Sequence, residues 1–336
     1  GIASAYLFSL AKQIDTDIGQ RLSSGVWDMP AQVYSRSWIL EKGSPLSRDN
    51  VVRILKSTRY HESPSPGGPG EYSISKDGIE IYRREFVYAD HSAAAGLYRI
   101  TFSEGKITAI SDESNRRNDA ALEIEPRLFS MMYSPGDEQR IFRPLVSFPK
   151  TLIDMLIATE DRSFWQHHGI NVTAIARAFI NNIRAGHTVE GGSTITQQVV
   201  KNLFLSRDKT YSRKIREILM ALILEHKFSK DRILELYLNE VYLGQDGSQG
   251  IYGFPLASTY YFGRQVNELT LPQQAMLIGM AKGASLYNPW THPENALLRR
   301  NVVLSAARTH GAIDEKSYQP ALKSELRVQP KGAVFI

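Results

Sequence analysis

The feature that most constrains the fold is a change of apolar periodicity at Pro149. After this proline, four apolar residues and one acid follow the i, i+3, i+4, i+7, i+11 spacing of one helical face: Ile153, Leu156, Ile157, Glu160 and Phe164. No alternation typical of strands interrupts the helical pattern that follows. We therefore expect residues 149–330 to form a mainly α domain.

Four more helices are expected in this second domain. The first begins at Ser206 or Asp208, the second follows Ser229, the third opens at Leu271 and the fourth covers residues 295–308. The inward face of the first is predicted to hold Ile215, Ile218, Leu219 and Leu222. The second brings another acid onto an apolar stripe, which consists of Ile233, Leu236, Tyr237 and Glu240.

Residues 36–125 predict a small α+β module. Ser47 is a candidate cap for a short helix, and the Pro- and Gly-rich residues 63–70 form a loop. Two hairpins follow, one turning at residues 77–78 and the other at residues 103–106. No cluster of catalytic side chains is found here, so we interpret the segment as a binding or spacing module.

The start of the chain is apolar for ten residues, and Lys12, Asp15 and Asp17 follow. A bilayer span needs about 20 residues. Residues 1–15 therefore fit either the C-terminal end of a membrane helix or an amphipathic helix packed on its own domain. Residues 16–35 and 126–148 are expected to be linkers.

Length and charge indicate two domains and an anionic partner. The chain has 336 residues, too many for one ordinary single-core domain. Residues 1–149 carry 18 Lys/Arg and 19 Asp/Glu, whereas residues 150–336 carry 22 and 16. A basic second half suits nucleic acid, an anionic membrane surface or a phosphorylated substrate, unless it is an ordinary basic surface. The absence of cysteine excludes a thiolate zinc site and a cysteine nucleophile.

Glu160 is the most informative single residue. Its place on an apolar stripe predicts a carboxyl group that is partly removed from water. Desolvation raises the pKa of a carboxyl group and suits it to proton transfer near neutral pH. The alternative is a buried glutamate that is merely paired or capped. Asp161 points to another face and is expected to hold the following turn.

Residues 191–198, Gly-Gly-Ser-Thr-Ile-Thr-Gln-Gln, form the second feature. The two glycines let backbone N–H groups approach an anion, and the hydroxyl and amide groups offer neutral donors for a sugar or phosphate. The segment lacks the Lys-Ser/Thr ending of a nucleotide P-loop. Taken alone, it is as often a polar helix start as a binding site.

A run of positive charge is the third feature. Six cations with a single acid among them occupy sixteen residues: Lys201, Arg207, Lys209, Arg213, Lys214 and Arg216. Arg213, Lys214 and Glu217 converge on one patch of a helix. The patch is either a solvated helix face with one ion pair or a clamp for a diphosphate, in which Glu217 orients the cations or shares a metal.

Two further groups have structural interpretations. Glu240 ends its helix and is expected to tie down the following loop. His167 and His168 are adjacent, so they cannot chelate a metal at helical spacing, and no H-E-x-x-H pattern exists. We interpret His167 as a hydrogen-bonded support for the Glu160 loop.

Five motifs in order make the chain resemble the family 51 glycosyltransferases, which polymerise peptidoglycan. Residues 160–169 resemble the E-D-x-x-F-x-x-H-x-G signature of the family, including Phe164 and His167. Residues 191–202 look like the second signature and residues 213–217 match the third, R-K-x-x-E. Residues 230–240 resemble the fourth, and residues 285–289 with Arg299 and Arg300 are similar to the last.

The flanks resemble bifunctional class A penicillin-binding proteins of the 1b type. Residues 26–34 after a membrane helix, followed by a small α+β module, fit that group. The resemblance implies that residues 36–125 are a UvrB-domain-2-like module that receives an outer-membrane lipoprotein activator. It also implies a transpeptidase domain after this stretch of sequence, a single-pass anchor in the inner membrane and a catalytic part in the periplasm of a Gram-negative bacterium.

The family implies an inverting transfer on a lysozyme-like helical domain, between a growing glycan held as undecaprenyl diphosphate and lipid II. Glu160 would take the proton of the acceptor 4-hydroxyl, and Glu217 would act beside the diphosphate clamp. The implied substrate-binding residues are Ser193, Thr194, Gln197, Gln198, Lys201, Asn202, Arg213 and Lys214. No cofactor is obligatory, although a divalent cation, Mg²⁺ or Mn²⁺, would fit beside Glu217. A lobe dipping into the membrane would present Val199, Val200, Leu203, Phe204 and Leu205.

Two other functions compete with this one. A lysozyme-like hydrolase or lytic transglycosylase also uses a partly buried glutamate, but it cuts neutral glycan and needs no cationic clamp. A basic module that binds nucleic acid would interleave cations with stacking aromatics, and residues 201–216 contain only Phe204 and Tyr211. Nucleic acid is therefore not an expected partner.

Overall fold

The computed structural model describes residues 2–23, 31–34, 37–88, 90–118, 120–126, 128–132, 141–186, 191–205 and 211–332. The chain forms two compact units. Residues 30–137 make up the small module, and residues 1–29 together with 138–336 make up the helical unit.

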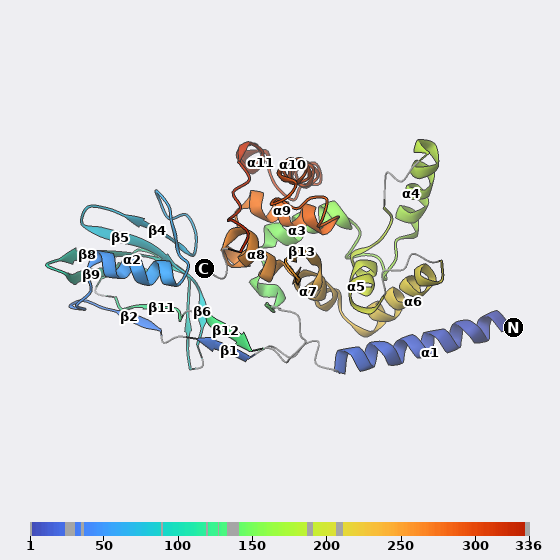
Figure 1. Cartoon of the computed structure of the whole chain (residues 1–336), viewed down its shortest axis with the longest axis horizontal. Helices are drawn as coiled ribbons and strands as arrows, with labels where there is room; N and C mark the ends of the chain where they lie inside the picture. Colours follow the sequence, from blue (N-terminus) through green and yellow to red (C-terminus); the bar gives the residue numbers. More distant parts are fainter. Residues whose placement is uncertain are drawn as a thin grey trace. The chain divides into compact units, whose positions relative to one another are not determined.

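The helical unit is built almost entirely of helices (Figure 1). Its helices are α1 (Ile2–Ser23), α3 (Lys150–Glu160), α4 (Val172–Ala185), α5 (Ile195–Phe204), α6 (Tyr211–Lys227), α7 (Lys230–Glu240), α8 (Phe254–Phe262), α9 (Leu271–Ala281), α10 (Pro293–Thr309) and α11 (Glu315–Lys323). Shorter elements are the 3-10 turns η1 (Leu145–Ser147) and η2 (Val266–Glu268) and the hairpin of β13 (Tyr242–Asp246) and β14 (Gln249–Tyr252).

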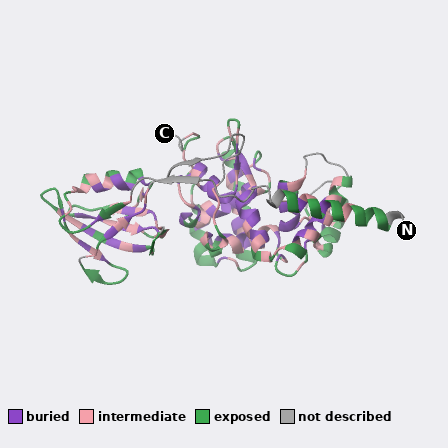
Figure 2. Ribbon diagram, turned by 90° about the horizontal axis from the view of Figure 1, so that it is seen from below, coloured by how far each residue is buried: buried purple, intermediate pink, exposed green. Residues whose placement is uncertain are grey.

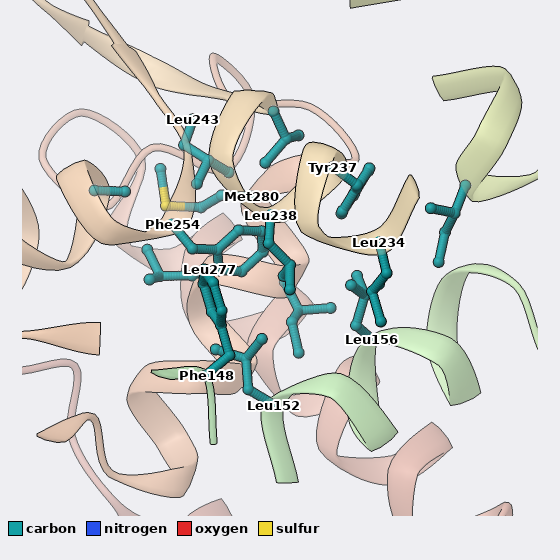
Figure 3. Packing of buried hydrophobic residues seen from close by; sticks show 14 of the residues in the cluster. Phe148, Leu152, Leu156, Leu234, Tyr237, Leu238, Leu243, Phe254, Leu277 and Met280 are labelled. Carbon is teal, nitrogen blue, oxygen red and sulfur yellow. The ribbon is translucent and has the colours of Figure 1, made fainter. Parts of the chain in front are cut away.

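The core of the helical unit lies where α3, α7, α8 and α9 meet (Figure 3). Leu152 and Leu156 of α3, Leu238 of α7, Phe254 of α8 and Leu277 of α9 are completely buried there. Truncating such a side chain to alanine typically destabilises a protein by about 2–5 kcal/mol. This core fixes the ends of α3 and α7, where the two candidate acids Glu160 and Glu240 are placed.

The small module consists of one sheet, three short ribbons and one helix. The sheet has the order β10-β9-β8-β5-β4-β3, with only β3 and β4 parallel. Its strands are β3 (His61–Glu62), β4 (Glu71–Ile74), β5 (Gly78–Arg83), β8 (Gly96–Ser103), β9 (Lys106–Asp112) and β10 (Arg117–Asn118). The ribbons pair β1 (Ala31–Tyr34) with β12 (Leu128–Met132), β2 (Trp38–Leu40) with β11 (Leu122–Ile124), and β6 (Phe86–Val87) with β7 (Ser92–Ala93).

The local predictions for the module are confirmed. Ser47 caps α2 (Arg48–Ser57), since its side chain accepts a hydrogen bond from the backbone N–H of Asn50. Both hairpins form, as β4–β5 and β8–β9. The second turns through Glu104 and Gly105, both at positive φ, as a tight hairpin turn requires. Figure 2 shows that the buried residues of the module lie between α2 and the sheet.

Parts of the predicted linkers belong to regular elements. Helix α1 continues to Ser23, and residues 31–34 pair with residues 128–132 in the β1–β12 ribbon. Much of the two predicted linkers, namely residues 24–30 and 133–140, lies outside the described residues.

The helical predictions are confirmed for α3, α7, α9 and α10, and the inward face predicted for α6 is confirmed only in part. Leu219 packs against the core, whereas Ile215 is 52% exposed and Leu222 is 39% exposed. Glu217 is buried together with Met220 and Leu224, so apolar residues alone do not mark the inward face. The predicted starts Ser206 and Asp208, together with Arg207 and Lys209, lie outside the described residues.

The sequence also missed several elements. Helices α4, α8 and α11 were not predicted, and the β13–β14 hairpin contradicts the expectation that no strands interrupt this domain. The expected membrane contacts of Val199, Val200 and Leu203 are wrong too, because these side chains are buried in the core, and Phe204 and Leu205 pack against it. Within the part of the chain that the structure describes, no helix has the length and apolar character to cross a membrane.

Candidate active site

Glu160 lies at the last position of α3, and its side chain is only 6% exposed. The predicted desolvated position is therefore confirmed. Its carboxylate Oε1 lies 3.4 Å from the Nη2 atom of Arg299 on α10. The Nε atom of Arg299 is buried and has no hydrogen-bond partner among the described residues. Because this contact with Arg299 is long, the carboxylate of Glu160 is still able to accept the proton of a hydroxyl group.

Asp161 joins the end of α3 to the start of α5. Its Oδ2 atom accepts hydrogen bonds from Nε2 of His167, at 2.7 Å, and from the backbone N–H of Ile195, at 2.9 Å. Nδ1 of His167 accepts from the backbone N–H of Gly169, so the imidazole hydrogen is on Nε2. These bonds agree with the predicted supporting roles of Asp161 and His167.

A second buried ion pair backs this network. The Nζ atom of Lys230 lies 2.6 Å from Oε1 of Glu225, which also accepts a hydrogen bond from the Thr196 hydroxyl. The Lys230 ammonium group sits 4.6 Å from the ring centroid of Phe164. α5, α6, α7 and the turn after Glu160 are therefore tied together by charge and by a cation–π contact.

The start of α5 is a capping box. Thr194 accepts a hydrogen bond from the N–H of Gln197, and the Gln197 side chain accepts one from the N–H of Thr194. The Thr194 hydroxyl in turn donates to the carbonyl of Gly169. Both residues are buried, so their polar atoms hold the turn, whereas Ser193 and Gln198 are partly exposed.

The predicted cationic patch forms on α6. Nζ of Lys214 lies 2.7 Å from Oε1 of Glu217 and donates to the Ser193 hydroxyl at 3.2 Å. Glu217 is buried, with a side chain that is 3% exposed, whereas the Lys214 side chain is 46% exposed. Nε2 of Gln197 approaches the same Glu217 oxygen at 3.4 Å. Arg213 is half-buried one residue before Lys214.

The start of α5 brings the two halves of the site together. On one side, the N–H of Ile195 is bonded to Asp161, the residue next to Glu160. On the other side, Ser193 is bonded to Lys214, which pairs with Glu217. The acid and the cationic patch are thus connected through three consecutive residues of one turn. The other two predicted contacts, Lys201 and Asn202, are exposed farther along α5.

Two glycines allow close packing around this turn. A Cβ atom on Gly192 would lie 2.9 Å from Cα of Ile175, so the backbone of α4 rests directly on the glycine. A Cβ atom on Gly279 would lie 2.8 Å from Cγ of Arg299, so this glycine of α9 leaves the path of the arginine side chain free. Neither position accepts a side chain without displacement of its neighbour.

Two groups near Glu160 had no assigned role from the sequence. Arg299 was part of the fifth motif, but its pairing with Glu160 depends on packing of α10 against α3. Burial raises the pKa of Tyr237 well above its usual range, and the negative charge of Glu160 raises it further. The phenol therefore stays protonated, and its OH has no hydrogen-bond partner among the described residues.

Glu240 is buried at the end of α7, directly before the β13–β14 hairpin, where a structural role was predicted. Among the described residues, no three His, Asp or Glu side chains come together as ligands for a metal ion.

Two family models match the chain. The Transglycosylase family model matches residues 127–308. The model of the bifunctional transglycosylase second domain matches residues 40–124, which lie within the small module.

Relatives named penicillin-binding protein 1B match nearly the whole chain, and one named 1A matches part of it. Penicillin-binding protein 1B of Escherichia coli K12 is 47% identical over 322 residues, which are 96% of this chain and 38% of the relative. Penicillin-binding protein 1B of Vibrio cholerae is 43% identical over 331 residues, 98% of this chain and 43% of the relative. Penicillin-binding protein 1A of Aquifex aeolicus is 46% identical over 197 residues, 59% of this chain and 27% of the relative. The chain thus spans about two fifths of the length of the 1B relatives. With a family model over more than half of its length and all five motifs in order, the chain belongs to the transglycosylase family.

Proposed function

We propose that the helical unit polymerises lipid II into β-1,4 glycan by an inverting transfer. The 4-hydroxyl oxygen of the acceptor attacks the anomeric carbon of the donor, and Glu160 receives the hydroxyl proton. The bond between that carbon and the diphosphate oxygen breaks, and undecaprenyl diphosphate leaves. The observation that carries the proposal is the attachment of Asp161, beside Glu160, and of Lys214 to the same turn at the start of α5.

The two halves of the site have complementary tasks. A base must be close to the attacking oxygen, and positive charge must be close to the oxygen that becomes negative as the bond breaks. Lys214 supplies this charge in partly exposed form, and we assign Arg213 and Lys201 to the same diphosphate. Ser193, Gln198 and Asn202 are then available to sugar and phosphate oxygens, while Thr194 and Gln197 shape the turn. A divalent cation beside Glu217 stays a prediction.

The main competing activity is hydrolysis of finished glycan. The largely covered Glu160 side chain fits both reactions, but the half-exposed Lys214 beside Glu217 suits a diphosphate, which finished glycan does not carry. We expect the purified protein to elongate lipid II and to leave finished peptidoglycan intact, as measured by gel separation of labelled glycan. Release of soluble fragments from finished peptidoglycan, with no elongation of lipid II, would reverse the assignment.

We further propose that α4 contacts the outer leaflet of the inner membrane, on its periplasmic side. One stripe of α4 exposes large apolar side chains at helical spacing, namely Val172 (67%), Ile175 (38%), Phe179 (66%) and Ile183 (64%). Exposed apolar stripes of this kind mark interaction surfaces. A lipid-linked substrate must be reached at the membrane, which supports this assignment over the buried residues of α5.

Replacing two residues of this stripe with glutamate is expected to weaken membrane binding. The double change Phe179→Glu and Ile183→Glu removes two exposed apolar groups and is expected to lower binding to vesicles of phosphatidylglycerol and phosphatidylethanolamine by at least about tenfold. The measurement is co-sedimentation with the vesicles. The matched control is Leu298→Glu with Val302→Glu on α10, two residues that are 66% and 52% exposed. Equal loss in the control, or unchanged binding of the α4 variant, would refute the membrane role of α4.

We propose that the small module binds an activator protein, which is an outer-membrane lipoprotein. Trp38, Ile39 and Val87 are exposed at 46%, 62% and 74%, which is unusual for such large apolar side chains within one small unit. His91 bridges Asp90 and Glu123, and thereby links the loop between β6 and β7 to β11, opposite Ile39. The neighbourhood of Ile39 and His91 therefore combines apolar and charged groups, as partner-binding surfaces do.

A further inference from the structure

Helix α1 is docked on the helical unit by one apolar stripe. Ile14 and Ile18 are completely buried and belong to the main core cluster, and Leu10 packs against the same cluster. These residues recur every four positions, so they share one face of α1. The neighbour of this face is α6, the helix that carries Lys214 and Glu217 (Figure 1).

Two ion pairs lie on either side of this stripe. Oδ2 of Asp17 is 2.6 Å from Nη2 of Arg216, and Oδ1 of Asp15 is 2.8 Å from Nζ of Lys227. Arg216 and Lys227 are separated by about 16 Å along the axis of α6, because each residue adds about 1.5 Å.

The two acids of α1 leave its axis in nearly opposite directions. Asp15 and Asp17 are two residues apart, and each residue rotates the side chain by about 100°. One acid therefore reaches toward the start of α6 and the other toward its end, with the buried stripe of Ile14 and Ile18 between them. One ion pair thus lies on each side of the apolar stripe, and together the two pairs fix the angle between α1 and α6.

These ion pairs serve geometry more than stability. The four side chains are 31–53% exposed, and exposed ion pairs contribute little to the free energy of unfolding. Their effect on the orientation of α6 is larger than their effect on stability, because α6 cannot rotate about its axis without breaking one of the two pairs.

The opposite side of α6 carries the active site. Lys214 precedes Arg216 by two residues and therefore points roughly away from α1. It reaches the Ser193 hydroxyl at 3.2 Å and Glu217 at 2.7 Å. A shift of α6 by about 1 Å away from the start of α5 would lengthen the contact between Lys214 and Ser193 beyond hydrogen-bonding range, while the Lys214–Glu217 pair would move with the helix.

We propose that Asp15, Asp17, Arg216 and Lys227 are positioning residues of the glycosyl transfer. They set the orientation of α6, and thereby place the Lys214–Glu217 pair against the turn at Ser193. A changed angle between α1 and α6 is then expected to lower turnover while the fold persists. The inference rests on the proposed function, since it assigns the Lys214–Glu217 pair to the diphosphate of the substrate.

Charge reversal tests the proposal. Asp17→Arg and Arg216→Asp, each alone, are expected to lower kcat for lipid II polymerisation by about tenfold or more. The combined swap restores the attraction and is expected to return kcat to within about twofold of the unchanged protein. The matched control is the exchange of Arg308 and Glu315, an exposed pair on α10 and α11, made as the same set of variants. Thermal unfolding of every variant checks that the fold is retained.

Docking is measured separately from activity. The chain has no cysteine, so Lys12→Cys on α1 and Leu222→Cys on α6 give two unique positions for nitroxide labels. A narrow distance distribution is expected in the unchanged protein and in the swap, and a shifted or broader one in each single reversal, where the buried stripe still holds α1 but its angle to α6 changes.

The outcomes separate the two proposals. Single variants with an altered distance distribution and normal kcat, single variants with the distribution of the unchanged protein, or a swap that restores neither property would each overturn the positioning role. If the unchanged protein shows the narrow distribution but does not polymerise lipid II, the proposed function itself is wrong.

Discussion

Glu160→Gln is expected to lower the polymerisation rate by about 10³-fold, with the fold and lipid II binding retained. Glutamine has the shape of glutamate and still offers an oxygen to Arg299, so the packing of α3 against α10 is kept. It has no lone pair that accepts a proton near neutral pH, so the acceptor hydroxyl loses its base. The measurement is elongation of labelled lipid II, together with thermal unfolding and lipid II binding.

The matched control is Glu125→Gln in the small module. Glu125 is also buried and paired with an arginine, since its Oε1 lies 2.8 Å from Nη1 of Arg84. This variant alters the stability of the module but is expected to leave the basal polymerisation rate unchanged. Normal turnover of Glu160→Gln would remove Glu160 as the base.

Lys214→Ala is expected to lower kcat/KM by about 10²-fold, mainly through weaker retention of the donor. The substitution removes the positive charge that faces the leaving diphosphate. It also leaves the buried Glu217 without its ion pair, while Nε2 of Gln197 stays 3.4 Å from its carboxylate oxygen. Repulsion between that carboxylate and the diphosphate adds to the loss.

The experiment for Lys214 compares donor and acceptor affinities in the same variant. Lys214→Arg keeps the charge and is the conservative control, expected to retain part of the activity. A donor affinity of Lys214→Ala equal to that of the unchanged protein would argue against a clamp at this position.

The sequence predicts the site best where local periodicity and burial agree. Glu160 and Glu240 each continue an apolar stripe of their helix. Glu240 is buried and the side chain of Glu160 is only 6% exposed, because the helices carrying them lie in the core. The same method fails for α6, where Glu217 takes an inward position beside Lys214 and leaves Ile215 exposed. A charged site on the inner face of a helix reverses the relation between hydrophobicity and burial.

The sequence of helix α4 contains a local pattern that is typical of a helix, although the helix was not predicted. Asn171 caps it, and Val172, Ile175 and Phe179 recur at helical spacing. An apolar stripe alone does not distinguish a face packed in the core from one directed to solvent or lipid. Only the structure shows that α4, rather than α5, exposes its stripe.

Local sequence patterns do not predict contacts between segments that are distant along the chain. Arg299 lies 139 residues after Glu160, and Ile195 lies 34 residues after Asp161. No periodicity relates such positions, so the motifs identified the participants but not their partners.

The contact of Gly192 with the backbone of α4 has a mechanical consequence. With only a hydrogen atom between Ile175 and the glycine, no compressible layer of side chains separates the two segments. If α4 contacts the membrane as proposed, a displacement of this helix by the lipid layer would pass directly to Gly192 and to the adjacent Ser193.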